Sequence, residues 1–135
     1  MVRVAAWSGD LEEARRVRAE ALVSPDTVSQ LTGFYLGVMF GELDVAALEV
    51  QVRELLAERD NPRFRSMICQ FATELMCLLG SAEHALGYFL RAADTALIDL
   101  DWVEQCVVLK PLRALPGFSE GRKRVRTRVE AIWNT

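Results

Sequence analysis

The sequence predicts an all-helical fold in which antiparallel helical hairpins stack on one another, with about seven to eight helices in its 135 residues. Three observations support this prediction. Apolar residues recur at steps of three and four along most of the chain, which is the period of a helix. No segment shows the two-residue alternation of a half-buried strand. A short pattern that begins with glycine also occurs three times, as expected of a helical repeat.

The repeated pattern begins at Gly9, Gly41 and Gly80, which are 32 and 39 residues apart. In each copy an alanine stands five residues after the glycine, with at least one acidic residue between them. Glycine in the left-handed conformation commonly ends a helix, and acidic residues are favoured in the first turn of the next one. Each glycine therefore predicts a tight turn between antiparallel helices, and the small alanine would let the second helix approach the first closely.

The expected helices follow from the apolar stripes and from the start and stop signals. In order they cover residues 2–8, 10–22, 25–40, 42–59, 62–79, 81–97, 100–106 and 117–133. Ser24-Pro25 and Asn61-Pro62 are the clearest start signals, with the polar residue as N-cap and proline at the first helical position.

The length fits a single domain. Its hairpin units would be about residues 1–23, 24–60 and 61–98, followed by a terminal unit of 99–135. Only eight residues precede Gly9, which is too few for a full first helix. A hairpin that lacks part of its first helix exposes apolar surface that a preceding repeat normally covers. We therefore expect either that the chain was excised from a longer protein or that this end associates with another copy.

The third unit resembles a tetratricopeptide (TPR) repeat. The matching residues stand at that family's glycine, small, aromatic and small positions: Gly80, Ala85, Phe89 and Ala92. The resemblance implies that the hairpins stack as a TPR-like right-handed solenoid.

Residues 92–128 resemble the terminal repeat of TPR arrays attached to bacterial signalling proteins, which include eukaryotic-like serine/threonine kinases, adenylate cyclases and large transcriptional regulators. The matching features are Asp101-Trp102, the element Leu109–Arg113 and Pro116–Phe118 before a basic final helix. This resemblance implies a sensing or docking module in the C-terminal part of such a protein.

The composition excludes several classes of protein. With 51% hydrophobic residues the chain has ample apolar surface to bury, which argues against disorder. A net charge of −3 argues against a general positive field for nucleic acid. The apolar stretches are shorter than the roughly 20 residues of a membrane span, and the N-terminus has no signal-peptide pattern. Three cysteines in apolar stretches, Cys69, Cys77 and Cys106, suggest buried thiols in a reducing, cytoplasmic compartment.

No catalytic or metal-binding motif is present. His84 is the only histidine, and its place in the first turn of an expected helix suggests a solvated surface residue. The cysteine spacing fits no metal site, and the acidic residues do not form a calcium loop. Phosphate-binding, dinucleotide-binding and hydrolase motifs are also absent. We expect no enzyme activity, no metal and no cofactor.

The expected partner site is a groove formed by the first helices of successive hairpins. In the TPR-like register the residues predicted to contact a partner there are Tyr35, Met39, Met67, Gln70 and Glu74. A groove with methionine, tyrosine and a few polar groups suits an amphipathic helix or an extended peptide. The alternative interpretation of the same residues is packing inside the array.

A basic patch on the last helix is the second candidate surface. Its members are Arg122, Lys123, Arg124, Arg126 and Arg128. We expect a solvated face of a terminal capping helix, with contact to an acidic partner surface as the alternative. Nucleic acid is not expected, because no base-stacking aromatic residues are interleaved with the basic ones.

The sequence therefore predicts a non-catalytic module that docks a protein or peptide segment. Two alternatives remain open. One is a small-molecule sensor that regulates an attached catalytic domain, and the other is a self-association module.

Overall fold

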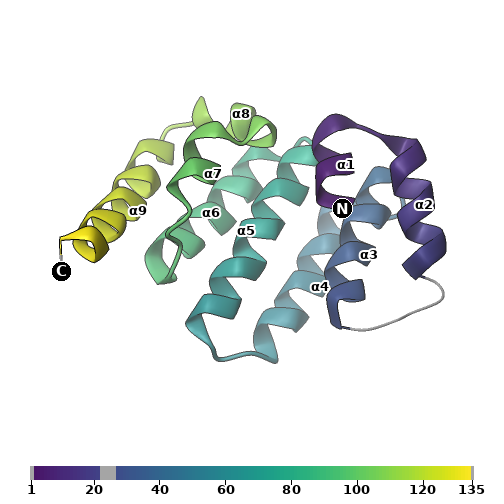
Figure 1. Ribbon diagram of the computed structural model, residues 1–135, viewed down its shortest axis with the longest axis horizontal. Coiled ribbons are helices and arrows are strands. Elements are labelled where there is room, and N and C mark those ends of the chain that lie inside the picture. Colours follow the sequence, from purple (N-terminus) through teal and green to yellow (C-terminus); the bar gives the residue numbers. More distant parts are fainter. Residues whose placement is uncertain (1, 22–26, 135) are drawn as a thin grey trace. The chain divides into compact units, whose positions relative to one another are not determined.

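The computed structural model describes residues 2–21 and 27–134. Over these ranges the chain is helical and contains no strand, which confirms the predicted all-helical fold. The elements are α1 (Val2–Ser8), α2 (Leu11–Ala21), α3 (Thr27–Met39), α4 (Val45–Ala57), α5 (Pro62–Leu78), α6 (Ala82–Thr95), α7 (Leu100–Gln105), the 3₁₀ helix η1 (Val107–Leu109), α8 (Lys110–Arg113) and α9 (Phe118–Trp133) (Figure 1). The start signal at Ser24-Pro25 lies outside the described residues, and the right-handed solenoid stays a prediction.

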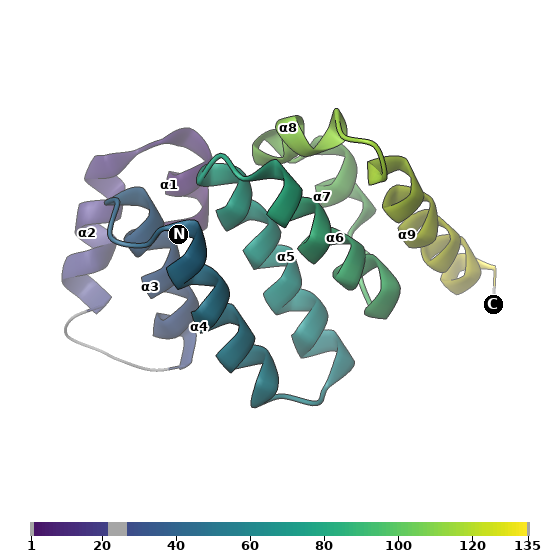
Figure 2. The same ribbon diagram turned by 180° about the vertical axis from the view of Figure 1, so that it is seen from behind.

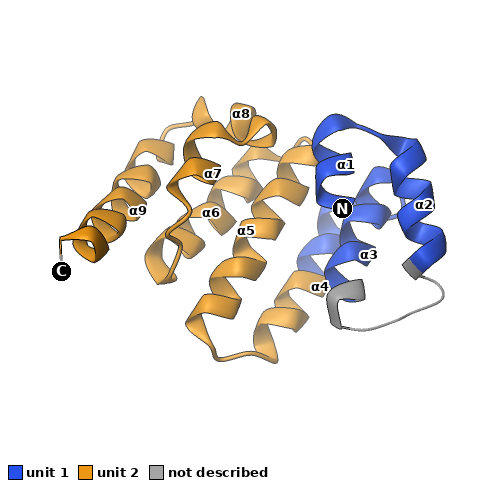
Figure 3. Cartoon of the chain, viewed as in Figure 1, with its two compact units in different colours: residues 1–50 blue, residues 51–135 orange. Residues whose placement is uncertain are grey.

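The chain divides into two compact units, residues 1–50 and residues 51–135, with the division inside α4 (Figure 3). In the first unit α1 packs against α2 and α3, and α2 also packs against α3. In the second unit α5 and α6 lie side by side, and α9 packs against α6, α7 and α8 (Figure 2). The predicted grouping into one domain with four hairpin units stays a prediction.

The three repeated glycines end their helices in the same way. Gly9, Gly41 and Gly80 have φ angles of +71°, +71° and +79°, in the left-handed region that favours glycine. The residue after each glycine donates its backbone N–H five residues back, through the bonds Asp10 to Ala5, Glu42 to Gly37 and Ser81 to Met76, at 2.9, 2.7 and 2.8 Å. The glycine N–H donates three residues back, so each turn is a Schellman motif. The predicted left-handed caps are confirmed.

The second repeat departs from the other two, because α4 begins at Val45 rather than at the predicted residue 42. The Leu43 N–H also donates to the carbonyl of Gly37, at 3.0 Å, which holds the chain out of a helix at that point. Asp44 then caps the helix, since its Oδ1 accepts the Ala47 N–H at 2.8 Å.

This later start changes which residue faces inward. Ala14 and Ala85 are fully buried, as expected for the small position after the glycine. Ala46 is exposed, and the expectation that it would face a neighbouring helix is wrong. Leu48 is fully buried instead. It donates its N–H to the Asp44 carbonyl, in the same way that Ala85 donates to Ser81.

Asn61 starts α5 as predicted. Its side-chain oxygen accepts the backbone N–H groups of Arg63 and Phe64, at 2.9 and 3.3 Å, and Pro62 is the first helical residue. The segment Val107–Arg113, for which no helix was predicted, forms η1 and α8. Its leucines Leu109 and Leu112 are fully buried, and α8 packs against α6.

Phe89 on α6 lies at the centre of the core of the second unit and is fully buried. Its ring centroid is 5.1 Å from that of Phe118 and 6.4 Å from that of Trp102. Gly121 on α9 faces the same ring, and a Cβ atom at that position would lie 2.4 Å from it. Because real Cβ atoms do not approach so closely, α9 reaches this position against α6 only with a glycine at residue 121.

Gly121→Ala is therefore expected to lower the free energy of unfolding by about 1–3 kcal/mol, the usual cost of overpacking a core. Gly87→Ala is the matched control. Gly87 lies on α6, and no atom lies within 4 Å of the place that a Cβ would take there, so alanine should raise stability by up to about 1 kcal/mol through its better helix propensity. Urea denaturation followed by circular dichroism measures both. Equal effects of the two substitutions would show that α9 has room at residue 121.

Candidate functional site

The residues of the predicted groove lie in both compact units. Tyr35 and Met39 are on α3 in the first unit, whereas Met67, Gln70 and Glu74 are on α5 in the second. The Tyr35 side chain is buried, with 2% of its surface exposed, and Met39 is half-buried. Of the two predicted residues on α3, Met39 therefore has more surface accessible to a partner than Tyr35.

On α5 the predicted binding face is partly covered by the chain itself. Glu74 is fully buried, and its Oε1 accepts the indole N–H of Trp102 at 2.6 Å. Gln70 donates its side-chain N–H to Oδ2 of Asp99, at 3.4 Å. Asp99 also caps α7, because its Oδ1 accepts the backbone N–H of Trp102 at 3.0 Å. The segment that starts α7 thus lies against the part of α5 where we expected a partner.

Met67 lies at the other end of this face and lines a surface hollow of about 610 Å³ beside the turn between α4 and α5. Met67 and Phe64 are its half-buried apolar residues. The remaining lining residues are exposed and polar: Glu58, Arg59, Asp60, Asn61 and Arg63. The Arg59 guanidinium lies over the Phe64 ring, 5.0 Å from its centroid. The result is an apolar floor surrounded by charges of both signs.

The sequence prediction included Met67 but did not include Phe64 or the charged residues around the hollow. The start signal Asn61-Pro62 was a usable clue, because it places Phe64 and Met67 on neighbouring turns at the beginning of α5. Nothing local in the sequence indicated that Trp102 would cover Glu74.

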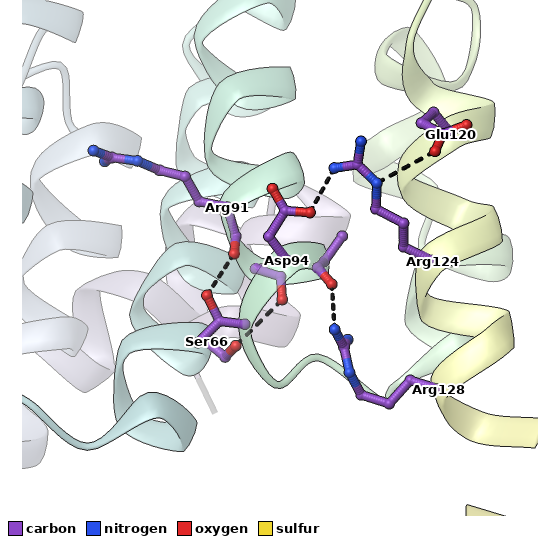
Figure 4. Close-up of polar contacts among 9 residues, drawn as sticks. Ser66, Arg91, Asp94, Glu120, Arg124 and Arg128 are labelled. Carbon is purple, nitrogen blue, oxygen red and sulfur yellow. Dashed lines mark hydrogen bonds and ion pairs between the residues drawn. The ribbon is translucent and has the colours of Figure 1, made fainter. Parts of the chain in front are cut away.

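The basic patch makes ion pairs with the acidic residues of its own chain. Glu104 on α7 accepts from Arg122 at 2.9 Å and from Arg126 at 2.8 Å, through the same carboxylate oxygen. Arg124 pairs with Asp94 at 2.5 Å and with Glu120 at 3.4 Å (Figure 4). The pairs with Asp94 and Glu104 join α9 to α6 and α7. Their side chains are largely solvated, so each pair contributes little to stability by itself.

Arg128 has a different role from the other members of the basic patch. Its two terminal nitrogens donate to the carbonyls of Ala93 and Leu97, at 2.6 and 2.7 Å, where α6 ends. Figure 4 shows Arg128 extending from α9 toward this end of α6. The last carbonyls of a helix lack partners within the helix, and the helix dipole favours a cation there. Arg128 therefore caps α6. Lys123 is exposed on α9.

Two further arginines cap helices in the same manner. Arg113 donates to the carbonyls of Val103 and Cys106, at 3.1 and 2.7 Å, at the end of α7. Arg65 donates to those of Leu56 and Arg59, at 2.5 and 2.9 Å, at the end of α4. All three contacts lie within residues 51–135.

The titratable side chains of the described part of the chain form no group of three or more that could hold a metal ion. His84 is exposed, and its Nδ1 lies 2.6 Å from the hydroxyl of Ser81. All three cysteines are buried, as predicted. Burial raises the pKa of the Cys77 thiol to about 12 and also raises the pKa of Cys69. A thiol that stays protonated is a poor nucleophile.

Comparisons with known proteins give no family assignment. No protein-family model matches this chain, and no curated protein or solved structure matches it. Over the residues described, no helix has the length and apolar character to cross a membrane.

Replacing Arg128 tests the cap on α6. Arg128→Gln is expected to lower the free energy of unfolding by about 1–3 kcal/mol, because two carbonyls lose a charged donor. Lys123→Gln removes the same charge from an exposed position of the same helix and should change stability by less than about 0.5 kcal/mol. Urea denaturation measures both variants. A similar, small effect of the two would show that Arg128 does not cap α6.

Acid tests the pairing of Glu104. Its hydrogen bonds to Arg126 and then to Arg122 hold the pKa of Glu104 below its ordinary value of 4.5. Because the pKa is lower in the folded state, the ionised carboxylate contributes stability above the unfolded value, and this contribution is lost as the pH falls through the lowered pKa. The free energy of unfolding should therefore fall less between about pH 5 and about pH 3 in Glu104→Gln than in the wild type. Urea denaturation at each pH measures the free energy of unfolding. If it falls equally in the two proteins, the pairing of Glu104 with Arg122 and Arg126 is contradicted.

Proposed function

We propose that this chain is a non-catalytic interaction module that binds a protein or peptide segment at the hollow beside the turn between α4 and α5. The observation that carries this proposal is the pair Phe64 and Met67, two half-buried apolar side chains on the floor of a hollow of about 610 Å³.

The apolar floor of the hollow would bind an apolar side chain of a partner, and the charged residues around it would contact the partner's neighbouring polar groups. Burying one leucine or phenylalanine side chain against Phe64 and Met67 would contribute about 1.5–3 kcal/mol. Methionine adapts to side chains of different shape, because it is unbranched and flexible. Arg63 and Asp60 lie at the edge of the hollow and are exposed, so they are suited to select the charges that flank the buried side chain.

The contacts of Gln70 and Glu74 narrow the predicted site. Since Asp99 and Trp102 engage these two residues, a partner would contact the Met67 end of α5 in this arrangement. Burial of Tyr35 similarly leaves Met39 as the accessible one of the two α3 residues. The resemblance of residues 92–128 to the terminal repeats of bacterial signalling proteins supports a regulatory setting for such a module.

The test compares two substitutions of an apolar residue by glutamate. Met67→Glu places a charge on the floor of the hollow, and Val107→Glu places one at a site on η1 that is 66% exposed and lies outside the hollow. The immobilised variants are incubated with lysate of the source organism, and the retained proteins are quantified by mass spectrometry. Met67→Glu should reduce retention of a specific partner at least about tenfold, which corresponds to about 1.4 kcal/mol.

The Val107→Glu protein should retain that partner as the wild type does, and both variants should keep the wild-type circular dichroism spectrum. Calorimetry with the purified partner then gives the affinity for each variant. The proposal fails if Met67→Glu and the wild type retain the same proteins in the same amounts.

A further inference from the structure

A second, smaller cavity of about 200 Å³ lies in the second unit, at the end of α4 and between α5 and α6. Its lining residues are Leu56, Arg65, Cys69, Arg91, Asp94 and Thr95. Leu56 and Cys69 are buried apolar residues, and two arginines line the same space. A cavity of this size is below the roughly 300–1,000 Å³ of sites for drug-sized ligands, so it suits one small chemical group.

Arg65 is held in place before any ligand arrives. One of its terminal nitrogens donates to the carbonyls of Leu56 and Arg59, as described above. The other two nitrogens of this guanidinium make no hydrogen bond to the described residues. Because the planar group is fixed by the cap, its remaining N–H groups are preorganised, and a ligand would immobilise little further side-chain motion.

Arg91 forms no ion pair with an acidic residue of the described chain. Its guanidinium lies over the ring of Tyr88, 5.8 Å from the centroid. Asp94 is the acidic residue of the cavity, and it pairs with Arg124 on α9 at 2.5 Å. Figure 4 shows the Arg91 side chain directed away from Asp94, whose carboxylate turns toward Arg124.

The positive charges of Arg65 and Arg91 both affect the thiol of Cys69. Burial raises the pKa of the Cys69 thiol, and the positive charges of Arg91 and then of Arg65 oppose that rise. Both arginines and Cys69 line the same cavity. An anion in the cavity would experience both charges, and the buried apolar floor would reduce their screening by water.

We propose that this cavity binds a phosphate group, held between Arg65 and Arg91. A phosphate monoester or free phosphate carries about −1.5 to −2 charges at pH 7, which two guanidinium groups match. Its oxygens also accept the paired N–H groups of an arginine in bidentate fashion. A carboxylate carries one charge and would satisfy one arginine. This site is separate from the hollow of the proposed function and does not depend on it.

The test uses the wild-type chain and inorganic phosphate at constant ionic strength, with the Nε–H signals of the arginines followed by nuclear magnetic resonance. We expect saturable shifts at Arg65 and Arg91. Arg91→Gln should weaken phosphate binding about tenfold or more, as expected for loss of a charge-assisted hydrogen bond. Arg53→Gln is the control, since Arg53 is an exposed arginine on α4 that does not line the cavity; it should leave the affinity unchanged.

Parallel titrations with O-phosphoserine and acetate identify the ligand chemistry. Tighter binding of O-phosphoserine assigns the site to a phosphoryl group on a larger molecule, whereas tighter binding of inorganic phosphate assigns it to the free anion. The proposal is overturned if phosphate causes no saturable shift, if Arg91→Gln binds as the wild type does, or if acetate binds as tightly as phosphate.

Discussion

The second compact unit depends on the close approach of α9 to α6 at Gly121. A side chain larger than hydrogen would collide with the ring of Phe89 there, so the glycine sets the distance between the two helices. At that distance Phe118 stacks on Phe89, and the arginines of the basic patch reach Asp94, Glu104 and the end of α6. Trp102 contacts Phe89 from α7 and also donates to Glu74. One aromatic ring thus connects the packing of α9, α6, α7 and, through Trp102, α5.

Arginine is suited to the helix ends of this unit for a geometric reason. Arg65, Arg113 and Arg128 each donate to two backbone carbonyls at the end of a helix. A guanidinium presents several N–H donors in a fixed plane, whereas lysine offers a compact ammonium on a flexible stem. The chain has fourteen arginines and two lysines, and at these three positions the structure supplies a physical reason for that preference.

Local features of this fold could be predicted from the sequence, and long-range contacts could not. The caps at Gly9, Gly41 and Gly80 and the start of α5 at Asn61 depend on residues a few positions apart, and they were predicted. Ala46 was misassigned because Asp44, not Gly41, sets the register of α4. Gln70 and Glu74 have their partners 29 and 28 residues further along. Glu104 lies 18 residues from Arg122, and Asp94 lies 30 residues from Arg124. Such pairs are decided by helix packing, which no spacing rule specifies.

The Schellman turns after α1, α3 and α5 have a consequence for how the chain folds. Each turn is closed by backbone bonds between residues no more than six positions apart, so it needs no distant segment in order to form. α5 packs against α6, the next helix along the chain. Contacts of this kind give a low contact order, which is associated with fast folding. A hairpin such as α5–α6 can therefore form by local contacts that start at its own glycine. The contacts of α9 join residues further apart in the sequence and so close the largest loops of the second unit.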